Sequence, residues 1–227
     1  MGSSSKEKKS NGGGALDGAE FERQELKVIF RTMEENDIHF QQLGPEQTDT
    51  IQAYVDKILA AGSPMTPKAV VAGDGLVGKW RLEYSTEQKY KILPPGSDVY
   101  TYVYDPKGGR LDTILMFPRS PIVKSIQVIC DYTISTNGVL DFVFKKTIVD
   151  IFGFSLPVPT FGTPNAFLEM QYFDGDLWME QFDEPAPNGE GVKKSVNVYR
   201  KIGSLTEADK AATIKAYSKN TLPTLRR

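Results

Sequence analysis

Hydrophobic and polar residues alternate with a period of two along most of the chain after residue 76. Residues 76–84 show the pattern clearly, because Trp80, Leu82 and Tyr84 alternate with three charged residues. Such alternation predicts a strand with one buried and one solvated face. We expect this segment to be the first strand of a sheet, with these three side chains facing its core.

Further strand-like segments follow, and turn signals separate them. Asn137-Gly138 is a strong signal for a two-residue hairpin turn, and Asp174-Gly175 marks a second hairpin. About eight strands joined mainly by hairpins, with no helices between them, predict a mainly β fold. We expect an antiparallel up-and-down β-barrel, because closure removes exposed sheet edges. The strands after the first are predicted at 98–104, 110–117, 122–135, 139–151, 167–173, 176–182 and 193–202.

Two amphipathic helices are predicted before the barrel, because apolar residues recur at helical spacing within residues 17–62. Asp17 and Glu20 form a capping-box pattern at the start of the first helix. Pro45 begins the second helix and Gly62 ends it. We expect both to pack on the barrel; the alternative is a pair that binds a partner. The remaining domain boundaries are a disordered tail at 1–16, a linker at 63–75, the barrel at 76–202, and a short C-terminal helix and tail at 203–227.

Composition excludes several classes of function. Lys and Arg number 27 against 29 Asp and Glu, and the net charge of −2 gives no basic surface for nucleic acid. The single cysteine, Cys130, allows no internal disulfide or zinc-binding spacing. We find no His/Ser/Asp set, no Gly-rich phosphate loop and no cluster of metal ligands, and we see no perturbed acid or base groups placed for catalysis in the barrel interior. The sequence therefore predicts a protein without catalytic activity, cofactor or metal. It also shows no long apolar run typical of a membrane-spanning helix and no secretory signal.

The interior of an eight-stranded barrel is either filled by side chains or holds one small ligand. Lys124 and Lys146 share the parity of the apolar interior positions, so they are candidates to receive a ligand carboxylate near the barrel mouth. The alternative is that a bulge or a strand end turns each lysine outward. The apolar residues predicted to line the ligand site are Leu82, Tyr84, Ile126, Val128, Phe142, Phe144, Leu168, Met170 and Tyr172.

An uncharged segment between Ile151 and Asn165 is unusual for a surface loop. Its prolines and glycines are expected to prevent a regular strand or helix. A segment of this kind either folds over the barrel mouth as a lid or contacts an apolar surface such as a membrane. We favour the lid. The residues expected to form it are Phe152, Phe154, Leu156, Val158 and Phe161.

The start and the end of the barrel segment resemble lipocalin-like barrels. Gly78-Lys79-Trp80 is similar to their Gly-x-Trp opening, in which the tryptophan fills the closed end of the barrel. In such barrels an arginine near the end of the last strand packs across that tryptophan. The resemblance implies that Arg200 lies against Trp80 and helps to close the barrel.

The order of segments resembles one family in particular, the plastid lipid-associated proteins, or fibrillins. Two helices and a linker precede Leu76–Thr86, which is similar to the first strand of that family. Tyr172–Glu180 is similar to its penultimate strand, and Val198–Arg200 to its last strand. The acidic segment Asp183–Gly191 departs from the family pattern.

This resemblance implies a plastid protein at thylakoids or plastoglobules, with a lipocalin-like barrel. It implies binding or organisation of a hydrophobic small molecule such as a carotenoid, a prenylquinone or a fatty acid, at a lipid surface and without a common catalytic activity. A plastid targeting peptide is expected on the precursor. The alternative function is a structural or assembly protein with a filled barrel, attached to a membrane protein complex such as a photosystem.

Overall fold

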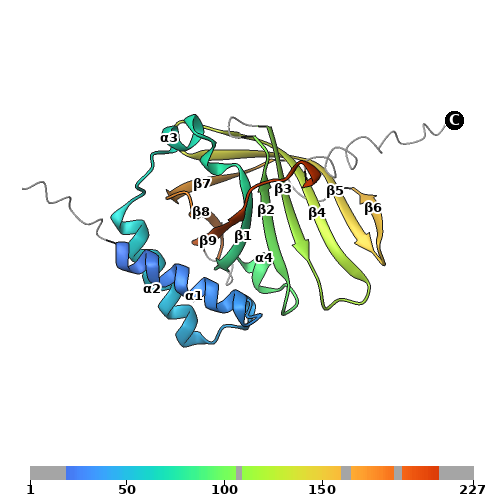
Figure 1. Ribbon diagram of the computed structural model, residues 1–227, viewed down its shortest axis with the longest axis horizontal. Coiled ribbons are helices and arrows are strands. Elements are labelled where there is room, and N and C mark those ends of the chain that lie inside the picture. The colour runs from blue at the N-terminus through green and yellow to red at the C-terminus, as the bar shows by residue number, and fades with distance from the viewer. Residues whose placement is uncertain (1–18, 106–108, 160–164, 187–190, 210–227) are drawn as a thin grey trace, which may run out of the picture.

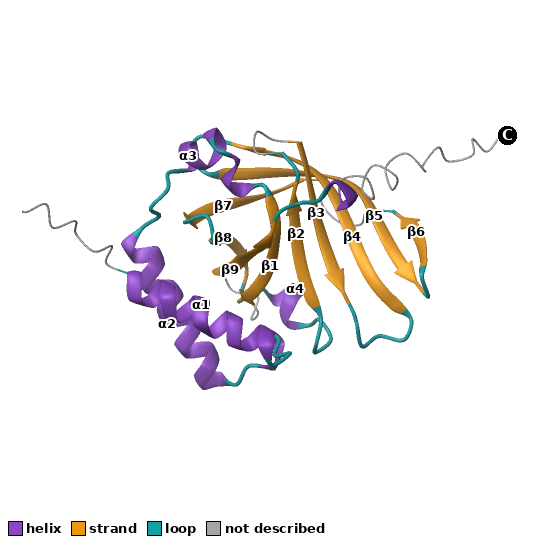
Figure 2. Ribbon diagram, viewed as in Figure 1, coloured by secondary structure: helices purple, strands orange, loops and turns teal. Residues whose placement is uncertain are grey.

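Eight strands close into an antiparallel up-and-down barrel in the computed structural model, which describes residues 19–105, 109–159, 165–186 and 191–209 (Figures 1 and 2). Each strand pairs with the next strand of the ring, and the last pairs with the first. This is the strand arrangement of lipocalins, so the predicted fold class is confirmed. The strands are β1 (Gly78–Ser85), β2 (Asp98–Val103), β3 (Gly109–Met116), β4 (Val123–Ile134), β5 (Val139–Ile151), β7 (Asn165–Phe173), β8 (Leu177–Pro185) and β9 (Val192–Gly203).

A ninth strand, β6 (Phe154–Val158), lies outside the ring. It pairs with residues 147–151 of β5, whereas β7 pairs with residues 139–143 of the same strand. The ends of β3, β4 and β5 together with β6 therefore form a flange that extends past the ring (Figure 1). The expectation that this segment forms no regular strand is wrong. Pro157 is tolerated because β6 is an edge strand, where the missing N–H breaks no ladder.

Two bulges turn predicted interior residues to the outside of the barrel. The pairing of β1 with β9 slips between Leu82 and Tyr84, and that of β7 with β8 slips between Met170 and Tyr172. Each slip adds one residue to one strand, so the side chains beyond it change face. Tyr84 and Tyr172 consequently lie in the cluster beneath the helices. The prediction that they line the interior is wrong.

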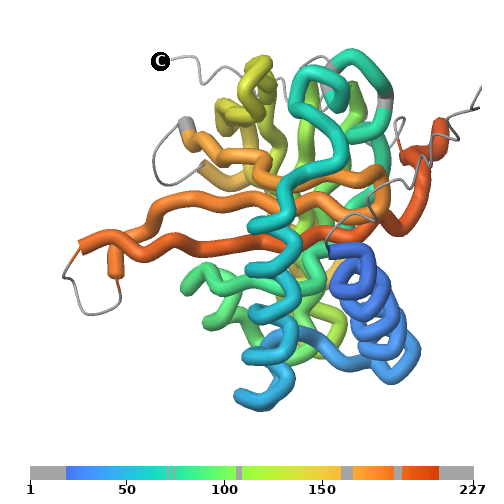
Figure 3. The backbone as a smooth tube through the Cα atoms, turned by 90° about the vertical axis from the view of Figure 1, so that its left-hand side faces the viewer, coloured from blue at the N-terminus to red at the C-terminus, as the bar shows by residue number. Residues whose placement is uncertain are grey.

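Two long helices cover the outside of the barrel wall. They are α1 (Glu20–Glu35) and α2 (Pro45–Ala61), joined by the short 3-10 helix η1 (Phe40–Gln42). Figure 3 shows α2 crossing in front of β8 and β9. Glu20 is the first helical residue and Ala19 the N-cap, so Glu20 does not take the third position that a capping box requires; Asp17 lies outside the described residues. The helices and the wall share one buried cluster, which includes Leu26, Phe30, Val55, Ile58, Leu177, Met179, Val196 and Val198.

Shorter helices lie at the two ends of the barrel. The predicted linker contains α3 (Pro67–Ala72) and η2 (Asp74–Leu76), and α4 (Gln88–Lys91) connects β1 to β2. Pro67 of α3 lies close to Gly138 in the turn between β4 and β5, so α3 sits at the end where β1 begins. Of the predicted C-terminal helix, residues 207–209 are helical and the rest lies outside the described residues.

Trp80 fills the end of the barrel where β1 begins. Its side chain is fully buried, and its Nε1 donates a hydrogen bond to the Leu76 carbonyl over 2.8 Å. The indole centroid lies 5.6 Å from that of Phe173 and 5.7 Å from that of Trp178. The cation above the indole is Lys201, whose Nζ is 5.4 Å from the ring centroid. This aromatic cluster closes one end of the interior.

Arg200 does not contact Trp80, and that prediction is wrong. Arg200 lies opposite Arg81 and Leu177 on the outer face of the wall, because Trp80 pairs with Lys201. Its guanidinium binds the buried carboxylate of Glu83 at 2.7 and 2.8 Å, and that of Glu34 on α1 at 2.6 Å. The arginine therefore ties a helix to the barrel wall and takes no part in closing the barrel end.

Candidate functional site

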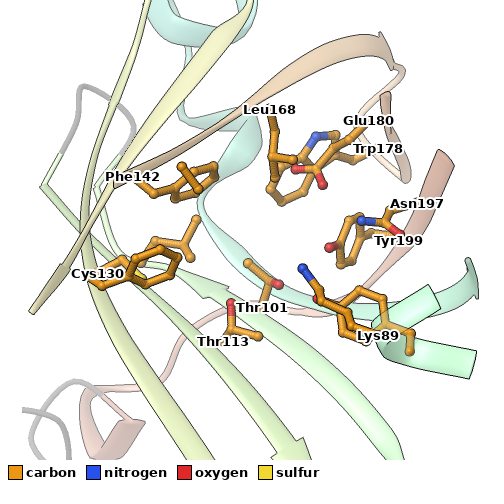
Figure 4. Close-up of a pocket in the computed structure, with 14 residues that line it drawn as sticks. Lys89, Thr101, Thr113, Cys130, Phe142, Leu168, Trp178, Glu180, Asn197 and Tyr199 are labelled. Atoms are coloured by element: carbon orange, nitrogen blue, oxygen red, sulfur yellow. The ribbon is translucent and has the colours of Figure 1, made fainter. Parts of the chain in front are cut away.

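A cavity of about 100 Å³ lies inside the barrel between the aromatic end and α4 (Figure 4). Ligand sites commonly have volumes of roughly 300–1,000 Å³, so this cavity holds only part of a drug-sized or lipid-sized molecule. Its apolar lining includes Leu111, Cys130, Phe142, Phe144 and Leu168, and its polar lining includes Lys89, Tyr90, Thr101, Thr113, Glu180, Asn197 and Tyr199.

The predicted interior residues divide between three places. Leu82 and Met170 lie in the interior core, with Val128 packed against it, and Phe142, Phe144 and Leu168 also line the cavity. Ile126 lies farther out, on the flange, opposite Leu115 and Val149. Tyr84 and Tyr172 lie outside the wall, as described above.

Glu180 is one of the cavity residues that the sequence analysis missed. Its side chain projects from β8 into the cavity and is 1% exposed. Burial raises the pKa of this carboxyl to about 8, although hydrogen bonds from Asn197 and Tyr199 and the charge of Lys89 oppose the rise. The group is therefore mostly protonated at neutral pH. The sequence signal was its parity, because Glu180 shares the parity of Trp178 and Phe182 and so falls on the apolar face of a predicted strand.

A hydrogen-bonded network surrounds Glu180 on the cavity wall. Asn197 lies directly opposite it on β9 and accepts a hydrogen bond from the Ser85 hydroxyl over 2.6 Å. The Asn197 amide nitrogen donates to Glu87 over 3.3 Å, and Glu87 also pairs with Lys89 at the exposed rim. This side of the cavity thus carries two carboxyl groups and one ammonium group that is already paired.

Two polar atoms of side chains that line the cavity have no hydrogen-bond partner within the part of the chain that the structure describes. They are the indole Nε1 of Trp178 and the Oε2 of Glu180, both buried. Both side chains project from β8 into the same side of the cavity (Figure 4). A buried polar group without a partner costs about 1–3 kcal/mol, so such groups in a native structure need an explanation.

The cavity wall continues onto the inner face of the flange. Residues directly opposite in an antiparallel pair share a face. The row Leu111, Cys130 and Phe144 in the cavity is therefore followed by two parallel rows across β3, β4, β5 and β6. We call the apolar members of these outer rows the ramp: Leu115, Ile126, Val128, Val149, Leu156 and Val158.

The ramp ends at an exposed apolar tip, which we define as Ile122, Phe152 and Phe154. Phe152 and Phe154 are 64% and 72% exposed, and Phe152 N–H donates to the Ile122 carbonyl over 3.0 Å. The expectation that this segment packs as a lid is therefore wrong for its described residues, because Leu156 is exposed as well and Val158 is half-buried. Phe161 lies outside the described residues.

Neither predicted lysine faces the cavity. A bulge between β4 and β5 places Lys146 opposite Ile129 on the outer face, where burial and the nearby Arg110 lower its pKa. Lys124 is exposed at a second slip near the start of β4, and its ammonium donates to the Ser120 carbonyl over 2.8 Å. The alternative reading, a bulge or a strand end, is the one that the structure supports. Among the described residues that line the cavity, the cation is Lys89 on α4.

Across the described ranges, no three or more His, Cys, Asp or Glu side chains gather in a way that could hold a metal ion. Within the same ranges, no helix combines the length and the apolar character needed to cross a membrane.

Comparisons with known proteins add little to this geometry. No family model matches the sequence, and a search of the curated proteins finds no match. Among solved structures, the chain is similar to a bovine odorant-binding protein in complex with a selenium-containing odorant. The match has 15% identity and a TM-score of 0.31, and it covers 66% of this chain and 83% of that one. A score this low supports no conclusion about function, so the fold rests on the strand pairing described above.

Proposed function

We propose that the protein binds one elongated apolar molecule, with one end in the barrel cavity and the rest along the ramp. The observation that carries this proposal is the continuity between cavity and ramp. The cavity of about 100 Å³ is too small for a whole lipid. The ramp offers a longer apolar surface, of which Leu156 is exposed and the other five residues are half-buried. Covering it stabilises a complex by about 25 cal/mol per Å² of apolar area removed from water.

The tip gives the protein a means of reaching a lipid surface. Ile122, Phe152 and Phe154 are all exposed at one end of the flange. Exposed apolar side chains gathered in one place mark an interaction surface. Inserting two or three of them into a lipid surface yields several kcal/mol, which suits weak and reversible attachment. Because the ramp begins beside the tip, a molecule leaving the lipid surface stays on apolar side chains until it reaches the cavity.

The family resemblance supports a more specific form of the proposal. The Leu76–Thr86, Tyr172–Glu180 and Val198–Arg200 motifs are similar to those of plastid lipid-associated proteins. We therefore propose a plastid protein of thylakoids or plastoglobules that carries or organises a carotenoid, a prenylquinone or a related lipid. We propose binding without catalysis.

The binding proposal is tested on the ramp. The double variant Ile126→Thr/Val149→Thr adds hydroxyl groups to the inner face, and we expect it to weaken binding of Nile red, a neutral apolar dye, by at least about fivefold. The matched control is Ile148→Thr, which changes the outer face of the same strand. Equal binding by both variants and by the unaltered protein would remove the ramp from the site.

A second candidate function follows from the small volume of the cavity. A barrel whose interior is mostly filled suits a structural or assembly protein that attaches to a membrane protein complex through its outer surface. This candidate predicts that Nile red and other apolar probes do not bind at all. It also predicts that the protein co-purifies with a membrane protein complex from its source membranes after lipid has been removed.

A further inference from the structure

The two unpartnered atoms, Trp178 Nε1 and Glu180 Oε2, belong to side chains that line the cavity, and their chemistry limits what can bind beside them. Trp178 Nε1 can only donate a hydrogen bond, whereas Glu180 Oε2 donates when the carboxyl is protonated and accepts when it is ionised. Both atoms are buried, so water in bulk does not satisfy them. Their pairing requires a polar group that sits inside the cavity.

The charges around the cavity disfavour an anion. Lys89 is the cation among the described lining residues, and it is already paired with the nearby carboxylate of Glu87. Glu180 is mostly protonated at neutral pH and supplies no positive charge. A carboxylate or a phosphate placed beside Glu180 would lose its hydration and gain no free cation. An uncharged oxygen group avoids this penalty.

The cavity has room for such a group. Its volume of about 100 Å³ is several times the roughly 10–15 Å³ that one water molecule requires by the same kind of measurement. A head of a few atoms therefore fits, and Phe144 in the cavity wall lies in the row next to the ramp.

We propose that Trp178 and Glu180 hold the polar head of the ligand, and that this head is an uncharged oxygen group, a hydroxyl or a carbonyl. This inference rests on the proposed function, because it assigns the head of the molecule whose chain lies on the ramp. A hydroxyl accepts from Trp178 Nε1 and donates to Glu180 or accepts from it. A carbonyl accepts from both, provided that Glu180 is protonated.

The protonation of Glu180 separates the two kinds of head. The pKa of about 8 makes Glu180 a donor at neutral pH and an acceptor at higher pH. Binding of a carbonyl should therefore weaken as the pH rises from about 7 to about 9, since the second donor is lost. Binding of a hydroxyl should persist, because the ionised carboxylate accepts its hydrogen.

The test uses four probes of equal chain length: decanol, decanone, decanoate and decane. Each competes with Nile red for the full-length protein. We expect decanol and decanone to bind at least severalfold more tightly than decanoate and decane at neutral pH. Trp178→Phe keeps an aromatic ring and removes the N–H donor. It should therefore weaken the binding of decanol and decanone by about three- to tenfold and leave the binding of decane unchanged.

A second variant keeps the test decisive if Trp178→Phe does not fold. Glu180→Gln preserves shape and hydrogen bonding but does not titrate, and we expect it to abolish the pH dependence of decanone binding. The matched control is Glu169→Gln, because Glu169 is an exposed glutamate on the neighbouring strand. It should change neither the affinities of the probes nor the pH dependence of decanone binding.

Each result bears on one of the two proposals. Tighter binding of decanoate than of decanol would overturn the uncharged head. If all four probes bind equally and neither cavity variant changes their binding, the proposed head site is overturned, whereas binding on the ramp still stands. If Nile red itself does not bind and no probe binds, the proposed binding function is overturned, and the head site with it.

Discussion

The carboxyl group of Glu180 couples the stability of the fold to pH. Burial raises its pKa from 4.5 to about 8, so the folded state binds a proton that the unfolded state releases between these two values. Stability contributed by this group is thus present below about pH 4.5 and is lost as the pH rises toward 8. Each unit of pKa shift corresponds to about 1.4 kcal/mol, so the loss amounts to a few kcal/mol.

We predict that Glu180→Gln removes this dependence. The free energy of unfolding of the variant, minus that of the unaltered protein, should increase between about pH 5 and pH 8. Urea denaturation at a series of pH values measures it. Glu169→Gln should show no such trend, because Glu169 is exposed. A constant difference across the range would mean that Glu180 titrates near its ordinary pKa.

The ion pair between Arg200 and Glu83 allows a second test of how single side chains contribute to stability. Glu83 is 2% exposed, and Arg200 is its closest cation at 2.7 Å, with Arg81 at 3.9 Å. Arg200→Met leaves a buried carboxylate without its main partner, so we predict a loss of about 3 kcal/mol of stability. Adding Glu83→Gln should recover much of it, as a double-mutant cycle of thermal or urea unfolding would show. Additive losses would mean that the two side chains are not coupled.

Single-residue predictions succeeded where strand parity ran without interruption. Leu82, Phe142 and Met170 lie inside the barrel because each precedes the bulge in its strand. Tyr84 and Tyr172 fail because each follows an extra residue, and no residue type in the sequence marks that residue as extra. Bulges are set by how two strands meet, which a single strand pattern does not contain.

At the scale of elements, the turn between β5 and β6 stores strain. Phe152 has a φ of +52° and the next residue, Gly153, has +83°. A bulky non-glycine residue in this region is uncommon and costs on the order of 1–2 kcal/mol. An exposed phenylalanine held there at such a cost points to a role at the surface.

We predict that Phe152→Gly raises the free energy of unfolding by about 1 kcal/mol and lowers co-sedimentation with lipid vesicles. Phe154→Ser removes an apolar side chain from the same tip without relieving the turn, so it should reduce vesicle binding with no gain in stability. Phe167→Ser, an exposed phenylalanine outside the tip, should leave vesicle binding unchanged. Unaltered binding by both tip variants would exclude the tip as a lipid contact.

Element types were easier to predict than their partners. The alternation after residue 76 and the turn at Asn137-Gly138 were sufficient for the barrel. The uncharged segment was misread because proline counts against a strand, whereas an edge strand accepts it. The short helix α4 brings Lys89 and Tyr90 to the cavity from a connection that has no periodic pattern, so part of the candidate site could not be seen.

For the whole molecule, the helix layer and the barrel share one buried cluster and should unfold together. Val55 of α2 is fully buried in it, whereas Val28 of α1 is exposed. We predict that Val55→Asp costs more than about 3 kcal/mol and lowers the melting temperature of the entire protein. Val28→Asp should have little effect. If the barrel of the Val55→Asp protein melts at its usual temperature, the result would favour the alternative that the two helices bind a partner.

The pairing of the first strand with the last has a consequence for how the chain folds. Gly78–Ser85 meets Val192–Gly203 across more than a hundred residues of intervening chain. Contacts of such long sequence separation form slowly, because the loop between them must close first. On the ribosome, α1 and α2 emerge long before β8 and β9, which supply most of the wall that they cover. The apolar faces of both helices therefore remain uncovered until β8 and β9 have been synthesised, and we expect the protein to depend most on chaperones during this interval.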